Sequence, residues 1–221
     1  MRYPGGKGKI FQHVINLLPP HGTYVESHLG GGAVLRKKKP SPKSVAIDLD
    51  PRVINYWKRN FPDLATYIRT DATEFLATFP FRSDDVLYCD PPYLPRTRHK
   101  ARIYRFDYRE ADHEQLLKVL LLLPCRVLIS GYPSEMYEQF LSRWHTYTFK
   151  AKAHDGLRSE KIWFNYEPPV RLHDSRFLGS NFRERERIRR RLRRIKRRIT
   201  KLSLQEQRLI ADWLTDEPVS R

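Results

Sequence analysis

The residues Asp90-Pro91-Pro92-Tyr93 combine a carboxylate, two rigid prolines and an aromatic ring directly after the apolar run 86–89, which we expect to be a buried strand. An exocyclic amine on a nucleobase is a poor nucleophile because its lone pair is conjugated with the ring. The Asp90 carboxylate and the Pro91 carbonyl could accept its two hydrogens and free that lone pair, and proline keeps the backbone stiff. Tyr93 offers a ring for stacking a flipped base. The motif therefore indicates methylation of a base amine, although the same residues also open ordinary loops.

Strand-like and helix-like segments alternate over the first three quarters of the chain. This alternation predicts an α/β, Rossmann-like fold with a mostly parallel sheet and helices on both faces. Such sheets place their sites beyond the carboxyl ends of the strands, where Glu26, Asp48 and Asp90 fall. We expect strands at 23–26, 44–48, 66–68, 86–89 and 126–130, closing strands near 146–150 and 161–166, and helices at 10–18, from 33, at 51–60, at 111–122 and at 133–144.

A glycine-rich segment, Glu26 to Gly32, follows the first expected strand and opens a helix near Ala33. Glycine lets the backbone turn sharply and approach a ligand closely. The segment lacks the Gly-x-Gly-x-x-Gly spacing of a dinucleotide fingerprint, so a plain tight turn remains an alternative. Its candidate ligand-binding residues are Glu26, Leu29, Gly30, Gly31 and Gly32.

Two acids follow at the ends of later strands. Asp48 comes eighteen residues after Gly30, where a carboxylate suits the two hydroxyls of a ribose. Asp71 ends a third expected strand and could accept a hydrogen bond from an adenine amine. It could equally cap the helix that begins near Thr73, and the two roles are compatible.

The composition narrows the range of partners. The 221 residues carry a net charge of +17, which favours a polyanion, either nucleic acid or an anionic surface. No apolar segment is long enough to span a membrane and the N-terminus lacks a signal-peptide core, so we expect a cytoplasmic protein. Cys89 and Cys125 fit a reducing compartment, and eight scattered histidines predict no metal site.

The C-terminal part differs from the α/β part, which we expect to cover 1–167. Residues 168–182 are typical of a linker, and 183–221 predict an arginine-rich helical extension. Within it, residues 183–201 hold twelve Lys or Arg against two Glu. Ser203 and Glu206 fit a capping box for a second helix that runs to about Leu214. The apolar residues of the first helix form one stripe, made of Ile188, Leu192, Ile195, Ile199 and Leu202.

Three interpretations of this extension remain open, and they do not exclude one another. The first is nonspecific contact with nucleic acid. The second is a homodimer, because the apolar stripe follows heptad spacing. The third is packing against the α/β domain. The candidate phosphate-binding residues are Arg189, Arg190, Arg193, Arg194 and Arg197.

With these pieces in order, the chain resembles the Dam-type family of DNA adenine-N6 methyltransferases over about residues 1–167. One such motif would be weak evidence, whereas an ordered set is strong. The set comprises Tyr3-Pro4-Gly5-Gly6-Lys7, Glu26 to Gly32, Asp48, Asp71, Asp90 to Tyr93, Tyr104, Phe106, His113, Leu116, Ser130-Gly131-Tyr132 and Trp163-Phe164-Asn165.

The resemblance implies S-adenosylmethionine as the cofactor. Asp48 would take its ribose and Asp71 its adenine amine. The target base would lie between Asp90 and Tyr93, and the sulfonium methyl would pass in line to the amine without a metal. The methionine part would be held by the segment Glu26 to Gly32 and by Tyr3, Gly5, Gly6 and Lys7.

The sequence departs from the family in two places, of which the unfamiliar C-terminal extension is one. The other is the interval between Asp48 and Asp71, which is too short for the usual target-recognition insert. A basic segment after the catalytic motif, 95–105, is left to approach the phosphates around a flipped base, unless it is only a solvated loop. Its candidate residues are Arg96, Arg98, Lys100, Arg102 and Arg105.

The leading hypothesis is therefore a DNA adenine-N6 methyltransferase of low or short-site specificity. Adenine-N6 methylation of RNA, such as ribosomal RNA, is the first alternative, because arginine-rich helices also bind structured RNA. A nucleic-acid-binding protein without activity on a methyltransferase scaffold is the second. Cytosine could use the same acceptors, but the acid at Asp90 favours adenine because related cytosine enzymes commonly carry Ser there.

Overall fold

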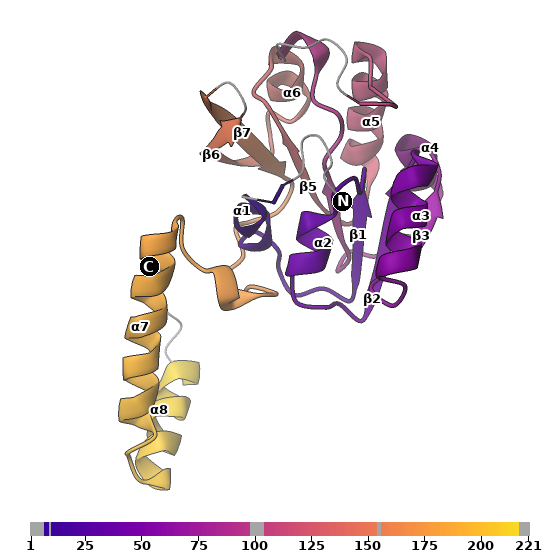
Figure 1. Cartoon of the computed structure of the whole chain (residues 1–221). Coiled ribbons are helices and arrows are strands. Elements are labelled where there is room, and N and C mark those ends of the chain that lie inside the picture. The colour runs from indigo at the N-terminus through magenta and orange to yellow at the C-terminus, as the bar shows by residue number, and fades with distance from the viewer. Residues whose placement is uncertain (1–6, 9, 98–103, 154–155, 217–221) are drawn as a thin grey trace. The chain divides into compact units, whose positions relative to one another are not determined.

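The computed structural model describes all residues except 1–6, 9, 98–103, 154–155 and 217–221 (Figure 1). The chain divides into two compact units, Met1–Ser175 and Arg176–Arg221. The first unit continues past residue 167, into the segment expected to be a linker. Asp174 is buried there and accepts a hydrogen bond from the Lys39 N–H over 2.9 Å, and the His173 N–H donates to the Leu18 carbonyl over 2.8 Å.

The first unit contains one seven-stranded sheet, in the order β3-β2-β1-β4-β5-β7-β6. Strands β1 to β5 are parallel, and β7 runs antiparallel to both β5 and β6. The chain leaves β1 toward β2 and β3 on one side and returns to β4 on the other, which creates a switch point between β1 and β4. The strands are β1 (Thr23–Ser27), β2 (Lys43–Asp48), β3 (Thr66–Arg69), β4 (Val86–Cys89), β5 (Arg126–Gly131), β6 (His145–Ala153) and β7 (Gly156–Phe164).

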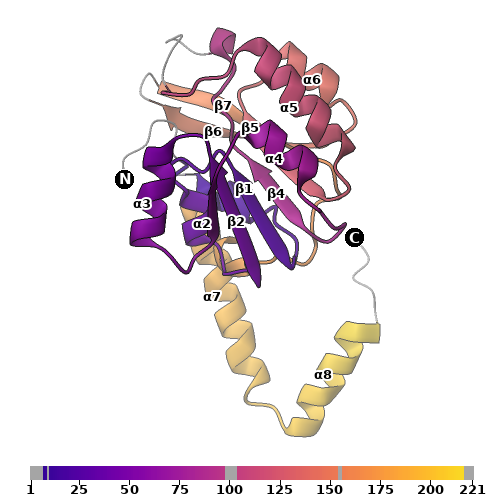
Figure 2. The same ribbon diagram turned by 90° about the vertical axis from the view of Figure 1, so that its right-hand side faces the viewer.

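Helices cover both faces of this sheet. Helix α4 packs on α5 and α5 on α6, above a core that includes Leu87, Val127 and Trp163. Helices α2 and α3 lie on the opposite face (Figure 2), where α2 contacts α1. The predicted Rossmann-like α/β fold is therefore confirmed. The helices are α1 (Phe11–Ile15), α2 (Ala33–Lys37), α3 (Pro51–Asn60), α4 (Ala72–Thr78), α5 (Glu110–Leu122) and α6 (Glu135–Phe140), with short 3₁₀ turns at Pro95–Thr97 and Ser175–Phe177.

Local chemistry fixes where the helices next to the pocket begin. The Asp50 carboxylate accepts the Arg52 N–H over 2.8 Å, and Pro51 occupies the first turn of α3, where its missing N–H costs nothing. Asp71 caps α4 in the same way. Helix α6 is shorter than the predicted 133–144, since it starts after its cap Ser134 and ends at Phe140. Each cap follows a strand end, so the caps bring polar groups to the edge of the sheet.

The β6–β7 hairpin is the feature that the parallel pattern did not predict in detail. Strand β7 pairs with β5 only through residues 161–164, whereas its pairing with β6 runs from residue 156 to residue 164. Residues 156–160 therefore extend beyond the parallel sheet as a two-stranded ribbon with β6. Side chains alternate along a strand, so Arg158 and Glu160 share one face of that ribbon.

The second unit consists of two helices, α7 (Phe182–Ile199) and α8 (Leu204–Asp216). The Asn181 side chain caps α7 by accepting the Glu184 N–H over 3.0 Å. The predicted capping box is present, since the Ser203 N–H donates to Glu206 over 2.7 Å and the Glu206 N–H donates to Ser203 Oγ over 3.3 Å. No residue of either helix is buried within the described chain, so most of its arginines face solvent. Among the described residues, no helix has both the length and the apolar character needed to cross a bilayer.

Candidate active site

The segment Asp90–Tyr93 leaves β4 at the switch point of the sheet. The Asp90 N–H donates to the Ser27 carbonyl over 3.4 Å, which extends the β1–β4 pairing by one residue. Pro91, Pro92 and Tyr93 are buried, and Asp90 is half-buried. The motif is thus held at the edge of the sheet and is not a solvated loop.

Two donors from distant segments bind the Asp90 carboxylate. The Lys7 ammonium lies 2.6 Å from Oδ1, and the Ser130 hydroxyl donates to the same oxygen over 2.8 Å. Behind Ser130, the Tyr88 hydroxyl lies 3.0 Å from Oγ. Among the described residues, no donor contacts Oδ2. The carboxylate therefore accommodates a nitrogen donor and retains a second oxygen for another.

Lys7 connects Asp90 to two further groups. Its ammonium donates to the Tyr93 hydroxyl over 2.5 Å and lies 4.0 Å from Glu160 Oε2. The Tyr93 hydroxyl in turn donates to Glu160 Oε2 over 2.9 Å. Burial raises the pKa of Glu160, and the Lys7 ammonium partly offsets this rise. The sequence predicted that Lys7 holds the cofactor, whereas here its ammonium contacts Asp90.

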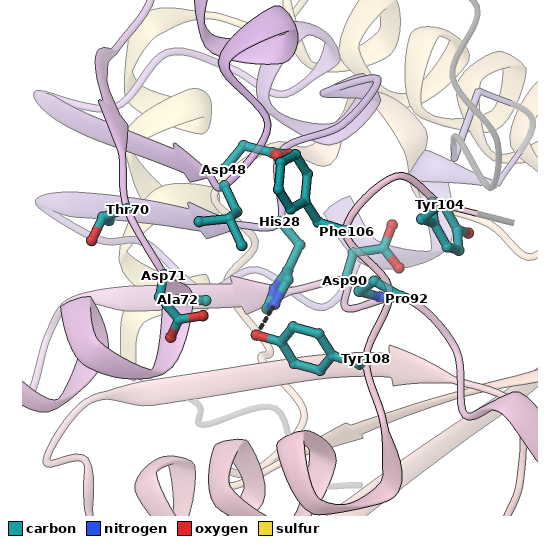
Figure 3. A pocket seen from close by; sticks show the side chains of 11 residues that line it. His28, Asp48, Thr70, Asp71, Ala72, Asp90, Pro92, Tyr104, Phe106 and Tyr108 are labelled. Carbon is teal, nitrogen blue, oxygen red and sulfur yellow. Dashed lines mark hydrogen bonds between the residues drawn. The ribbon is translucent and has the colours of Figure 1, made fainter. Parts of the chain in front are cut away.

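A pocket joins the carboxyl ends of β2, β3 and β4 (Figure 3). Three carboxylates line it, those of Asp48, Asp71 and Asp90, and none of the described lining residues is Lys or Arg. Such a lining attracts a positively charged ligand. The other residues of the lining are His28, Leu49, Thr70, Ala72, Pro92, Tyr104, Phe106 and Tyr108.

Asp48 ties the glycine loop to the end of β2. Its Oδ2 accepts the Gly30 N–H and its Oδ1 accepts the Asp50 N–H, each over 2.8 Å. Burial raises the pKa of Asp48, and these two hydrogen bonds act in the opposite direction. The carboxylate is thus fixed in orientation, and each oxygen keeps a lone pair for a ligand hydroxyl.

The glycine loop depends on a close approach of its backbone to Trp57. Gly30 and Gly32 have φ values of 45° and 50°, which favour glycine. The Trp57 Nε1–H donates to the Gly30 carbonyl over 3.0 Å, and the indole fills the space that a Cβ at Gly32 would need. Leu29 is buried and Gly31 half-buried. The loop is therefore a shaped element and not an arbitrary turn.

Asp71 caps α4, and its place in the pocket lining is compatible with the second role that the sequence left open. Its Oδ1 accepts the N–H groups of Thr73 and Glu74, over 2.8 and 3.2 Å, so it caps α4. The residue also lines the pocket (Figure 3). Because both cap bonds end on Oδ1, Oδ2 can accept a hydrogen bond from a ligand.

His28 is a pocket residue that the sequence analysis did not single out. It is the only non-glycine residue of the described chain with positive φ, at 59°. Its Nε2 lies 2.9 Å from the Tyr108 hydroxyl (Figure 3). Desolvation lowers the pKa of His28 to about 3 and raises the pKa of Tyr108 well above its ordinary value, so both are neutral near pH 7. The pair ties the glycine loop to the segment that precedes α5.

Glu26 is not part of the pocket lining, although the sequence predicted it as a ligand-binding residue. It is buried, and its Oε2 accepts the Tyr24 hydroxyl over 2.7 Å. Burial, with the nearby Asp90 carboxylate, raises the pKa of Glu26 to about 7. Lys38 is also buried, and burial lowers its pKa to about 8.

The structure describes only some of the basic residues that the sequence predicted to bind phosphates. Arg96 and Arg105 lie at the surface, where Arg96 is 3.5 Å from Glu110 and Arg105 is 3.6 Å from Asp50. Of the α7 arginines, Arg189 contacts Glu186. The side chains of Arg190, Arg193, Arg194 and Arg197 have no acidic partner within the described chain and are exposed. Arg98, Lys100 and Arg102, like Tyr3, Gly5 and Gly6, lie outside the described residues.

The described residues contain no group of three or more His, Cys, Asp and Glu side chains arranged to hold a metal ion. Cys89 and Cys125 are free and buried. The Ser27 hydroxyl donates to Cys89 Sγ over 3.0 Å, and burial raises the pKa of both thiols to about 12. These cysteines are therefore packing residues.

No protein-family model matches the chain, and no curated protein matches it. Solved structures with a similar arrangement include magnesium protoporphyrin IX methyltransferase of Synechocystis with bound SAH, at 10% identity and a TM-score of 0.49, over 72% of this chain and 83% of that one. A dimethyladenosine transferase from Plasmodium falciparum has 11% identity and a TM-score of 0.47, over 70% and 59% of the two chains. Precorrin 8W decarboxylase of Methanobacterium thermoautotrophicum has 14% identity and a TM-score of 0.48, over 74% and 93%. With likenesses this distant, the fold class rests on the strand order of the chain itself.

Proposed function

We propose that the protein transfers a methyl group from S-adenosylmethionine to the exocyclic N6 amine of adenine in nucleic acid, with DNA as the first substrate. The observation that carries this proposal is the ammonium of Lys7, 2.6 Å from Asp90 Oδ1, at the edge of a pocket that also holds Asp48 and Asp71. A base amine is likewise a nitrogen with hydrogens to donate. The position of Lys7 thus supports Asp90 as the acceptor for such an amine.

The residues present fit S-adenosylmethionine. Asp48 offers fixed acceptor oxygens for two ribose hydroxyls, and Asp71 Oδ2 offers an acceptor for the adenine amine. The aromatic side chains of Tyr104 and Phe106 supply apolar surface in the same pocket. The bound cofactor would supply a methyl group on a sulfonium, whose positive charge suits a pocket lined by three carboxylates.

The remaining roles belong to the motif itself. Asp90 and the Pro91 carbonyl would accept the two hydrogens of the target amine and orient its lone pair toward the methyl group. Tyr93 would stack on the flipped base. The arginines of α7 would bind phosphates, which gives affinity without sequence preference. A short interval between Asp48 and Asp71, filled by α3 and β3, favours low specificity.

Transfer of labelled methyl from S-adenosylmethionine tests this function directly. Duplex DNA of varied sequence, single-stranded DNA and ribosomal RNA fragments are the substrates, and mass spectrometry identifies the methylated nucleoside. We expect N6-methyladenine in DNA, spread over many sequences. Label confined to one palindromic site contradicts low specificity, label in RNA alone makes RNA the substrate, and a methylated cytosine contradicts the choice of base.

Asp90→Ala should remove the transfer and leave binding of the cofactor and nucleic acid in place. Asp63→Ala is the matched control, since Asp63 is an exposed acid in the loop between α3 and β3. Full activity of Asp90→Ala contradicts our assignment of the site. A wild-type protein that binds nucleic acid and never transfers methyl is a binding protein on this scaffold.

A further inference from the structure

Glu160 is a largely buried acid beside the Asp90–Lys7 pair. It lies on the ribbon formed by β6 and β7, and its side chain is 12% exposed. Its partners come from the opposite end of the chain and from the catalytic motif, namely Lys7 and Tyr93. Burying a carboxylate is costly unless it is paired, so its position between a lysine and a tyrosine calls for an explanation.

The charges around Glu160 do not balance in a static arrangement. Among the described residues, two carboxylates, Asp90 and Glu160, face one ammonium, that of Lys7. Burial and the charge of Asp90 raise the pKa of Glu160, whereas Lys7 lowers it. Arg158 shares the face of β7 but is directed to the Thr97 carbonyl, 3.4 Å from Nη1, and over the Tyr132 ring. The arrangement is an ammonium shared between two acids, currently bound to Asp90.

Lys7 occupies Asp90 Oδ1, one of the two carboxylate oxygens that could accept a hydrogen of the target amine. Its nitrogen lies 2.6 Å from Asp90 Oδ1, which is hydrogen-bonding distance for the base amine as well. A neutral amine can displace it only if the ammonium finds another partner, because an unpaired buried charge is strongly destabilising. Glu160 Oε2 is 4.0 Å away, so a movement of about 1 Å makes a direct ion pair at normal charge-assisted distance.

We propose that Glu160 is a positioning residue that takes over the Lys7 ammonium when the target amine binds to Asp90. In the free protein Lys7 pairs with Asp90 and occupies its Oδ1. In the complex the Lys7–Glu160 pair forms, and Asp90 is released to the base. This inference rests on the proposed function and adds a residue and a regulatory contact to the same site.

Glu160 also fixes the ring on which the base is proposed to stack. The Tyr93 hydroxyl donates to Glu160 Oε2, and the Tyr93 ring packs edge-on against Tyr132, with centroids 4.6 Å apart. Glutamine at position 160 keeps an oxygen that can accept the Tyr93 hydroxyl and removes only the charge. The variant Glu160→Gln therefore separates the exchange of Lys7 from the support of Tyr93.

The test is a double-mutant cycle of methyl transfer with Glu160→Gln, Lys7→Met and the two together. In Glu160→Gln the ammonium keeps Asp90 as its one acidic partner among the described residues. The value of kcat/KM for nucleic acid should therefore fall about tenfold or more, the usual scale for a lost buried charge partner. The affinity for S-adenosylmethionine should not change. Once Lys7 is absent, Glu160 has no ammonium to receive, so the double variant should match Lys7→Met within about twofold.

Glu138→Gln is the matched control. Glu138 pairs with Lys161, the next residue along β7, at 2.7 Å and outside the site. The rate of the Glu138→Gln variant should equal that of the wild type.

The pH profile of methyl transfer is the second readout. Glu160 must be ionised to receive Lys7, so the wild-type rate should fall as the pH drops through the raised pKa of Glu160, and Glu160→Gln should lack this component. The proposal is overturned if Glu160→Gln has the kcat/KM of the wild type. It is also overturned if the losses of the two single variants multiply in the double variant.

A failure of the proposed function can be told apart from a failure of this inference. If the wild type transfers methyl to no nucleic acid, the carboxyl ¹³C signal of Glu160, assigned by its loss in Glu160→Gln, still reports the shared ammonium. Lys7→Met should raise the pKa of Glu160, because Lys7 lowers it. An unchanged titration of Glu160 in Lys7→Met shows that the two groups do not interact and refutes the exchange.

Discussion

The Trp57 indole fills the space beside Gly32 that any larger residue would need, and the backbone of Gly32 has a φ of 50°. Steric exclusion and backbone conformation thus act together at one position of the glycine loop. The Nε1–H of the same indole donates a hydrogen bond to the Gly30 carbonyl over 3.0 Å. A single side chain of α3 therefore shapes the loop on which the proposed ribose contact depends.

Gly32→Ala should lower the free energy of unfolding by about 2–4 kcal/mol, because it adds overpacking to backbone strain. Denaturant unfolding measures this loss. The control is Gly22→Ala, where the nearest atom outside the adjacent residues is 3.8 Å from the new Cβ and φ is not positive. A loss no larger than that of Gly22→Ala would show that Trp57 can move aside.

Asp48→Asn should weaken binding of S-adenosylmethionine about tenfold or more. Both carboxylate oxygens of Asp48 accept backbone N–H groups. In asparagine one oxygen is replaced by an NH₂ group, which is a donor and cannot accept the N–H that faces it. Titration calorimetry with the cofactor measures the change. Asp50→Asn is the matched control, because asparagine also caps helices well and should preserve the start of α3. Equal affinities of the two variants would contradict the ribose role of Asp48.

Glu26→Gln should change how stability depends on pH. Burial raises the pKa of Glu26 to about 7 in the folded state, above its ordinary value of 4.5. The folded protein then binds the proton more tightly, so stability falls as the pH rises from about 4.5 to 7. This loss amounts to at most about 3.5 kcal/mol, at about 1.4 kcal/mol per pKa unit.

Glutamine cannot ionise and can still accept the Tyr24 hydroxyl. Unfolding of the Glu26→Gln variant should therefore show a shallower decline between pH 4.5 and 7 and a relative gain at pH 8. Parallel stability curves for the wild type and the variant would show that Glu26 titrates normally.

Replacing Arg190, Arg193 and Arg197 by Gln should weaken nucleic-acid binding and its salt dependence. Each lost phosphate contact on duplex DNA lowers the slope of log K against log salt by about 0.9, so the triple variant should lose about 3. Fluorescence anisotropy at several salt concentrations measures the slope. The rate at saturating nucleic acid should persist.

Arg208→Gln is the control for this variant, since Arg208 of α8 pairs with Asp212 at 3.1 Å. Its salt slope should match that of the wild type. If the triple variant has the salt slope of the wild type, α7 does not bind phosphates, and dimerisation or packing against the α/β domain remains as its role.

The sequence predicted the parallel part of the site well, for a physical reason. The acids Asp48, Asp71 and Asp90 each follow a short apolar run, and parallel strands bring their carboxyl ends to one edge. Local periodicity therefore placed residues that are far apart in the chain. The capping box at Ser203 was equally local and equally predictable.

The antiparallel part was not predictable in the same way. Lys7 and Asp90 are 83 positions apart, and no period connects them. Glu160 was missed because the approximate position of β7 did not reveal that it inserts between β5 and β6. One signal was available, since Glu160, Ile162 and Phe164 lie on the same face of a strand. A charged residue on an otherwise apolar face indicates that a partner of opposite charge lies nearby. His28 could not be foreseen, because its positive φ depends on the packed loop.

The contact between Lys7 and Glu160 spans nearly the whole first unit. A ribosome adds β7 only after the parallel strands β1 to β5 have been made, so a nascent chain can form the Asp90–Lys7 pair before the second acid exists. Contacts of such sequence separation form slowly, because the loop that joins them is long. During synthesis the acceptor oxygen would remain blocked by Lys7, and the protein would acquire the means to open its site only with the last strands of the sheet.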